Sequence, residues 1–361
     1  MRRILIKYRI LMNENQDVIK QVVGIDIGKD LFYACHKVLN SKHQTIIKGT
    51  KSFSNDLLGM QEFYIWCEKR SRESIKNVVF VMEATGVYYE NLAYFLYEYD
   101  CLVSVQLAQK IKYYAKSCNL KTKTDKVDSK MIAEFGIEKN LSGTELWTPP
   151  GKSFKMIRDL SREHTSLKEA CSAARSQLHA LKQAHNVYPR VIELKQQQIE
   201  FYQQQEEAVK QELLLLVKED ESLYTRVENI VSVKGLGFIT VIKILAETNG
   251  FLLFRNIRQL VSYAGLDVIE KESGSFKGKT KISKKGNARI RSALYMPAMT
   301  AAVYNSELKT FYNRVNEGRN IKRQGLIAVM RKLLILVYTL WRKNEAYIEN
   351  YPEMNLIAIK G

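Results

Sequence analysis

Runs of apolar residues divide the first part of the chain into short, regularly spaced strands. From Val22 to about Lys51 the pattern predicts three consecutive strands joined by tight turns. A fourth strand is predicted over 78–82, where every residue is apolar, as is typical of a strand covered on both faces. A fifth follows over 102–105. The pattern therefore predicts a mixed sheet with a buried centre.

Helical spacing of apolar residues separates the later strands. Helices are predicted over 55–70, with Ser54 or Asn55 as N-cap, and over 88–97. The stretch 110–123 is interpreted as a basic connection, and Thr124 is expected to cap the next helix. Three strands, then helix, strand, helix, strand and helix, is the order of a ribonuclease H-like domain.

Between Pro149 and about Leu223 the chain is rich in Gln, Glu, Lys and Leu and nearly free of Gly. Apolar residues recur at the alternating three-four spacing of a heptad seam, and 186–189 interrupts it. We expect an antiparallel coiled-coil arm that mediates self-association into a dimer or tetramer, because a heptad seam must bury its apolar face. His164 lies on the seam and is interpreted as a core residue.

The last part of the chain is predicted to be mostly helical. The predicted domains are an N-terminal extension (1–21), an α/β ribonuclease H-like domain (22–148), the coiled-coil arm (149–224) and a helical C-terminal domain (225–361). Composition gives a formal net charge of +18 and a pI near 9.5, which favours nucleic acid as partner and anionic membrane second.

The other bulk properties narrow the class of protein. The five cysteines show no C-x-x-C spacing, so we expect reduced thiols in a bacterial cytosol. The longest apolar run, 333–341, is too short to span a membrane, and no signal peptide is expected. Met1 and Met12 are both possible starts.

Two glycine-containing segments of the C-terminal domain are candidates for binding phosphate. Lys234, Gly235 and Gly237 precede a predicted helix, as in helix-hairpin-helix modules whose backbone N–H groups bind phosphate; a turn needed only for helix packing is the alternative. The second segment is interpreted as an anion-binding loop rather than a solvated face. Its basic residues are Lys277, Lys279, Lys281, Lys284, Lys285, Arg289 and Arg291.

Four carboxylates are the candidate metal ligands. Asp26 and Glu83 fall in or at the end of predicted buried strands, where an acid is unexpected unless a cation compensates its charge. Asp125 and Asp128 are three residues apart, on one face of a helix's first turn. Carboxylate oxygens suit hard ions, so we predict a two-metal phosphodiester site using Mg²⁺, with Mn²⁺ as a substitute.

The same segments resemble a known family. Gly24-Ile25-Asp26-Ile27-Gly28-Lys29, Met82-Glu83-Ala84-Thr85-Gly86 and Thr124-Asp125-Lys126-Val127-Asp128-Ser129 look like the Asp-Glu-Asp-Asp signature of the insertion-sequence-110 family of transposases. The segments around Gly235-Leu236-Gly237, Ala264-Gly265-Leu266, Ser273-Gly274 and Ile282–Asn287 look like that family's C-terminal transposase domain.

The resemblance implies a RuvC-like domain and a nucleophilic serine acting on donor and target DNA under a guiding bridge RNA. By position the serine is Ser273, with Ser275 as the rival. The basic loop around it could stabilise a phosphoserine link to DNA while the metals polarise the same phosphate. One alternative is a RuvC-like Holliday-junction nuclease that uses water alone, and a second is a non-catalytic nucleic-acid scaffold. The Gly24–Gly28 run also opens many sugar kinases, but their second glycine-flanked Asp strand and Gly-Gly adenosine site are not found.

Overall fold

The computed structural model describes residues 18–349 except 73, 85, 120–123, 253, 271, 274–275 and 279–280. The chain divides into two compact units, 1–149 and 150–361. This division separates the predicted α/β domain from the predicted arm and helical domain, which share the second unit.

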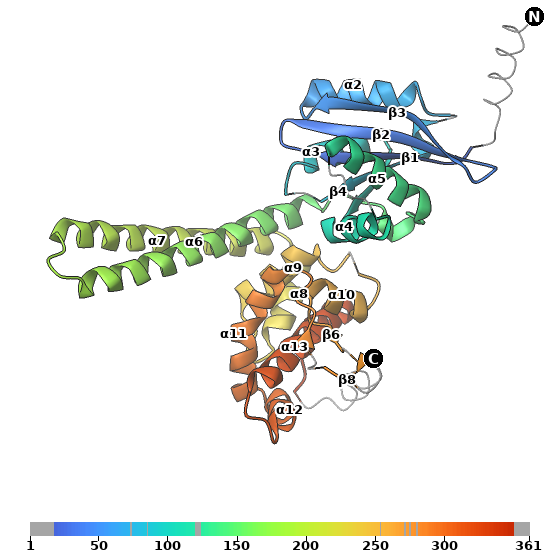
Figure 1. Ribbon diagram of the computed structural model, residues 1–361. Helices are drawn as coiled ribbons and strands as arrows, with labels where there is room; N and C mark the ends of the chain where they lie inside the picture. The colour runs from blue at the N-terminus through green and yellow to red at the C-terminus, as the bar shows by residue number, and fades with distance from the viewer. Residues whose placement is uncertain are drawn as a thin grey trace, which may run out of the picture. The chain divides into compact units, whose positions relative to one another are not determined.

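The first unit is built on a five-stranded mixed sheet (Figure 1). The strand order is β3-β2-β1-β4-β5; β1 to β3 are antiparallel neighbours, whereas β4 runs parallel to β1 and β5 parallel to β4. This is the sheet that the sequence pattern predicts, although the first strand begins four residues earlier, inside the predicted extension. The strands are β1 (Val18–Ile27), β2 (Leu31–Asn40), β3 (Thr45–Ser54), β4 (Val78–Glu83) and β5 (Leu102–Gln106).

Helices cover both faces of this sheet, so alternate residues of β1 enter two different cores. Val23 and Ile25 pack with α2 (Leu57–Glu68) and α3 (Glu90–Glu98). Val22 packs on the opposite face, with apolar residues of α4 (Ala108–Ser117) and α5 (Asp125–Glu138). A central strand covered on both faces is expected to be continuously apolar, which explains the run over 78–82.

Two local predictions in this unit are wrong. Asp56, rather than Ser54 or Asn55, caps α2, because its carboxylate accepts a hydrogen bond from the Gly59 N–H at 2.8 Å. The stretch interpreted as a basic connection contains α4, whose Ile111 and Tyr114 are three residues apart and both buried against the sheet. The high lysine content of this short helix hid its apolar face.

His36 on β2 makes the stability of the first unit depend on pH. Its ring is fully buried, neither ring nitrogen has a hydrogen-bond partner among the described residues, and burial, with Arg70 and Lys48 nearby, lowers its pKa to about 4. The unfolded state therefore binds a proton first, so stability is full above pH 6.5 and falls as the pH drops toward 4. We expect the wild type to lose about 2–3 kcal/mol more than His36→Leu between pH 7 and pH 4.5. Urea unfolding at both pH values measures this, and equal losses would show that His36 is not responsible.

The second unit begins with a helical hairpin. Figure 1 shows α6 (Lys152–Gln183) and α7 (Pro189–Lys218) running side by side in opposite directions. Cys171 and Ala174 of α6 pack against Ile199 of α7, as the seam predicts. The turn between the helices falls on the predicted interruption. The antiparallel pair is thus confirmed, whereas supercoiling of the pair remains a prediction.

The rest of the second unit is a helical core with a small β-ribbon. The helix α13 (Arg323–Lys343) is long and apolar enough to cross a membrane, but 56% of its most apolar stretch is buried, as is typical of a core helix. Val329, Leu333 and Val337 are fully buried among the other helices. The helices are α8 (Glu221–Val231), α9 (Phe238–Thr248), α10 (Ile257–Ala264), α11 (Ala288–Tyr304), α12 (Ser306–Asn316) and α13 (Arg323–Lys343).

Candidate active site

The strand register brings Asp26 and Glu83 to one edge of the sheet. Ile25 of β1 pairs with Met82 of β4, so Asp26 and Glu83 are the next residues on adjacent parallel strands. Side chains alternate along a strand, so both carboxylates point to the face of Val22 and Gly24, which α5 covers. Both residues are half-buried.

The packing of α5 fixes where its first turn lies. A Cβ on Gly24 would be 2.1 Å from the Ala133 nitrogen and 2.4 Å from the Ser129 oxygen, whereas one on Gly136 would be 2.5 Å from Val22 Cγ1. The helix therefore runs antiparallel to β1, with Gly136 over Val22 and Ser129 over Gly24. One more turn toward its N-terminus reaches the end of β1 that carries Asp26.

Asp125 and Asp128 occupy this first turn. Thr124 caps the helix, as predicted, because its hydroxyl accepts a hydrogen bond from the Val127 N–H. Asp125 continues the stripe that faces the sheet, four residues before Ser129. Asp128 is half-buried and Asp125 is exposed. The fold thus brings the backbone positions of all four predicted acids to one end of the sheet.

The donor set at this edge fits a hard divalent cation, because all four side chains offer only carboxylate oxygens. Asp26, Glu83 and Asp128 each interact with other groups of the protein. As the side chains stand, no group of three His, Cys, Asp or Glu within the described part of the chain is close enough to hold an ion. Binding of an ion at this edge would therefore require these side chains to take up other positions.

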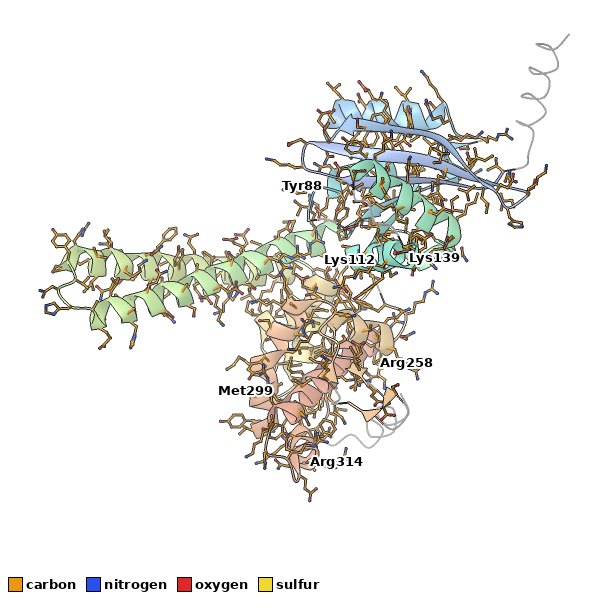
Figure 2. All side chains as sticks on the ribbon, viewed as in Figure 1. Tyr88, Lys112, Lys139, Arg258, Met299 and Arg314 are labelled. Atoms are coloured by element: carbon orange, nitrogen blue, oxygen red, sulfur yellow. The ribbon has the colours of Figure 1, made fainter. Side chains whose placement is uncertain are left out.

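Asn55 was missed as a site residue, since the sequence indicated only a possible helix cap. Its side-chain amide donates to the Gly28 carbonyl oxygen at 3.0 Å and to the Tyr88 carbonyl oxygen at 3.1 Å. These bonds join the turn after Asp26 to the segment after Glu83; Figure 2 labels Tyr88 on that segment. Asn55 thereby fixes the two acid-bearing segments to each other.

Ser273 lies near the tip of a small ribbon in the second unit. At the base of the ribbon β6 (Val268–Ile269) pairs with β9 (Lys281–Ile282), and farther out β7 (Glu272–Ser273) pairs with β8 (Phe276–Lys277). Ser273 is exposed. Ser275, the alternative nucleophile, and Lys279, a predicted basic residue of the loop, lie outside the described residues.

The basic residues of the predicted loop surround the base of this ribbon. Lys281, Lys284, Lys285 and Arg289 are exposed, as anion binding requires. Arg291 differs from them, because it is half-buried and its guanidinium donates to the Ala264 carbonyl oxygen at 2.8 Å. The charged loop is therefore open to solvent, while Arg291 holds α11 against the end of α10.

The glycine turn before α9 has a packing role. Gly235 has a φ of +106°, and a Cβ there would be 2.9 Å from Ala301 Cβ on α11. Close helix packing thus accounts for Gly235. Gly237 faces open space, and the Lys234 amine binds the Glu349 carboxylate at 2.9 Å. Phosphate binding by this turn remains a prediction.

Two transposase family models match this chain. The model described as Transposase IS116/IS110/IS902 family matches residues 227–313, and a second transposase model, named for its DEDD residues and the IS110 group, matches residues 23–186. The chain belongs to the IS110 family of transposases. It is therefore a DNA recombinase or transposase enzyme.

Two curated relatives of this transposase match it over nearly its whole length. The pilin gene-inverting proteins of Moraxella bovis and Moraxella lacunata are each 27% identical over 92% of this chain and 99% of their own. The insertion element IS900 uncharacterized 42 kDa protein of Mycobacterium paratuberculosis is 25% identical over 37% of this chain and 33% of its own. The yeast mitochondrial Holliday junction resolvase aligns at 16% identity over 35% of this chain and 82% of that one, with a TM-score of 0.25.

A cavity with lysine and aromatic side chains lies beside α4 of the first unit of the transposase. Lys110 and Lys139 line this open cavity of about 610 Å³ together with aromatic side chains, among them Tyr113, and with Glu145, whose carboxylate lies 3.3 Å from the Lys110 amine. Figure 2 labels Lys112 on the same helix and Lys139 just after α5. Lysines interleaved with aromatic rings suit a nucleic-acid strand, because phosphates bind the amines and bases stack on the rings.

The close approach at Gly24 gives a test of the carboxylate edge. Gly24→Ala is expected to lower the free energy of unfolding by about 3 kcal/mol, because backbone atoms of α5 must move, and to impair recombination, because Asp125 and Asp128 move with the helix. Gly151→Ala is the control, since a Cβ there meets nothing within 4 Å and should cost only about 0.5 kcal/mol. Urea unfolding measures both; equal effects would mean that α5 does not bear on Gly24.

Proposed function

We propose that this transposase cuts and rejoins DNA with Mg²⁺ or Mn²⁺ bound by Asp26, Glu83, Asp125 and Asp128, and with Ser273 as the nucleophile. The observation that supports the proposal is that the C-terminal ends of β1 and β4 lie near the N-terminus of α5, because these three segments carry the four acids. When bound, the divalent ions would stabilise negative charge on the reacting phosphate.

The serine step follows from ordinary phosphoryl chemistry. The Ser273 oxygen forms a bond to phosphorus, the bond from phosphorus to one deoxyribose oxygen breaks, and the serine proton is transferred to that leaving oxygen. Rejoining reverses these changes with a different DNA hydroxyl. The exposed position of Ser273 and the cationic groups at the base of its ribbon favour this role, because they attract the DNA backbone.

The partners that we propose are donor DNA, target DNA and a structured guide RNA. The net charge of +18 supports a polyanionic partner. Basic groups on α4 and on the ribbon base give each unit its own surface for nucleic acid. The relatives named for pilin gene inversion favour recombination between DNA segments over simple cleavage.

The arm and the cellular location complete the proposal. We infer that α6 and α7 mediate association into a dimer or tetramer, because exposed apolar side chains remain along the arm, including Val191, Leu194 and Phe201.

The absence of paired cysteines among the described residues agrees with a reducing cytoplasm.

Removal of divalent ions tests the metal part. Incubation with EDTA should reduce recombination of a plasmid carrying the element junction by at least about a thousandfold, and Mg²⁺ or Mn²⁺ should restore it. DNA binding, measured by mobility shift in the same buffer, should persist because the basic surfaces do not need the ion. Full activity after EDTA would contradict the proposal. Metal-dependent cleavage without any protein–DNA adduct would instead favour the junction nuclease that uses water.

A further inference from the structure

A buried carboxylate lies beneath the ribbon that carries Ser273. Glu247 is on α9, among apolar residues of the helical core, and its side chain is only 4% exposed. A buried charge of this kind is costly unless it is paired and hydrogen-bonded. No sequence pattern singled out Glu247, which is the next-to-last residue of a largely apolar helix.

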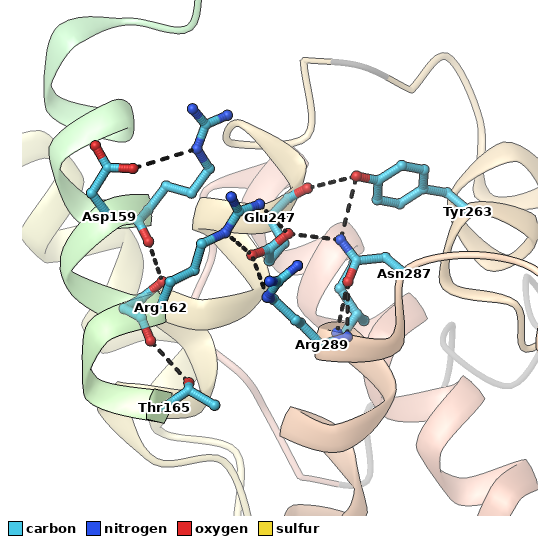
Figure 3. Close-up of polar contacts among 10 residues, drawn as sticks. Asp159, Arg162, Thr165, Glu247, Tyr263, Asn287 and Arg289 are labelled. Carbon is cyan, nitrogen blue, oxygen red and sulfur yellow. Dashed lines mark hydrogen bonds and ion pairs between the residues drawn. The ribbon is translucent and has the colours of Figure 1, made fainter. Parts of the chain in front are cut away.

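Cationic and amide groups from other segments satisfy this carboxylate (Figure 3). Arg162 of α6 binds both of its oxygens, at 2.8 and 3.2 Å, and the Asn287 amide donates to Oε2 at 2.8 Å. Arg289 Nε lies 3.9 Å from Oε1. Burial by itself would raise the pKa of Glu247, but the bonds from Arg162 and Asn287 outweigh it, so the pKa is below its usual value. The carboxylate is therefore charged at neutral pH.

The same residue holds both ends of the ribbon. Tyr263, just before the ribbon, donates from its hydroxyl to the Glu247 carbonyl oxygen at 3.2 Å. Asn287, just after the ribbon, binds the Glu247 carboxylate, and its backbone N–H donates to the Tyr263 carbonyl oxygen at 2.6 Å. The Asn287 side-chain oxygen also caps α11. Glu247 therefore binds both Tyr263 and Asn287, the residues at the two ends of the segment that forms the ribbon.

The close packing of this base leaves little freedom to rearrange. A Cβ on Gly286 would be 2.3 Å from the Tyr263 oxygen, and Gly265 has a φ of +66°. The Lys284 N–H donates to the Gly265 oxygen, and Ser283 binds Asp267 through both its N–H and its hydroxyl. A rigid base means that its orientation determines the direction in which the outer part of the ribbon points.

We propose that Glu247 is a positioning residue that sets the orientation of the Ser273 ribbon and, through Arg162, ties it to the base of the arm. The proposal rests on the proposed function in one respect, namely that Ser273 is the attacking group. Glu247 touches no DNA in this account. It acts by holding Tyr263 and Asn287 in fixed positions relative to each other. Loss of the Glu247 charge should therefore slow the attack of Ser273 more than it weakens DNA binding.

The experiment follows covalent attachment of full-length protein to end-labelled DNA carrying the element junction in single-turnover conditions. The protein is purified without nuclease treatment, so that any bound RNA is retained. Glu247→Gln keeps the shape of the side chain and removes its charge. We expect its rate constant for adduct formation to fall about ten- to a hundredfold. The final adduct yield and the Kd for DNA should stay within about twofold, because the protein remains folded and the basic surface is unchanged.

Matched variants separate positioning from stability. Glu228→Gln removes an exposed carboxylate on α8 that takes no part in the contacts of Glu247, and it should keep the wild-type rate. Arg162→Gln should resemble Glu247→Gln, and the double variant should be no slower than the slower single one, because both changes disrupt one network.

The outcomes are distinct. A wild-type rate constant in Glu247→Gln, with either full or reduced yield, would overturn the positioning role, because a reduced yield alone reports a smaller folded fraction. If wild-type protein itself forms no adduct on DNA that it cuts, the serine mechanism fails instead, independently of Glu247. A slow rate with full yield in Glu247→Gln and in Arg162→Gln supports the proposal.

Discussion

Replacing Asp26 with asparagine is expected to abolish recombination, with a loss of at least about a thousandfold, while the protein stays folded. The substitution keeps the size of the side chain and removes the charge that β1 contributes beside Glu83. An amide binds a divalent ion far more weakly than a carboxylate does, so the site would lose its central ligand. The melting temperature should stay close to that of the wild type, because asparagine keeps the size of the aspartate side chain.

Asp30→Asn is the matched control for this experiment. Asp30 lies four residues farther along, in the turn after β1, and it is exposed rather than directed at α5. Its substitution should leave recombination within about twofold, because a surface charge of this kind contributes little. Plasmid recombination at fixed Mg²⁺ measures both variants. Wild-type activity in Asp26→Asn, or equal loss in both variants, would refute the site.

Replacing Ser273 with alanine is expected to abolish both the covalent protein–DNA adduct and strand joining, again by at least about a thousandfold. The variant lacks the oxygen that forms the bond to phosphorus, yet the ribbon keeps its base contacts through Ser283 and Asn287. DNA affinity should therefore remain within about twofold. Denaturing electrophoresis of labelled DNA detects the adduct directly.

Ser275→Ala is the necessary companion variant, because the two serines are only two residues apart. If Ser273 is the nucleophile, Ser275→Ala should still form the adduct. The reverse result would move the nucleophile by two residues and leave the rest of the account intact. Normal strand joining by both single variants and by the double variant would exclude serine catalysis.

The parts of the fold that the sequence predicted are those governed by local pattern. Period-two and continuous apolar runs marked the strands, and a threonine before two acids marked the start of α5. The heptad spacing predicted the helical hairpin, because the helix that packs against α6 is α7, the next one along the chain. α4 was missed because only two of its side chains are buried and the rest of the helix is polar and basic.

The parts of the site that were missed depend on contacts between distant segments. Glu247 is joined to Arg162, 85 residues away, and to Asn287, 40 residues away. Asn55 binds backbone oxygens 27 and 33 residues away. No spacing rule in one sequence reveals such pairings. The motif around Asp26 could be recognised, but the reason for Gly24 became clear only when α5 was seen to pack on it.

The most direct test is anomalous scattering from crystals of the full-length protein grown with DNA and Mn²⁺. We expect strong manganese peaks within coordination distance of the carboxylates of Asp26 and Glu83 and of at least one acid in the first turn of α5. Manganese bound elsewhere, with these side chains directed away from it while DNA is present, would contradict the account.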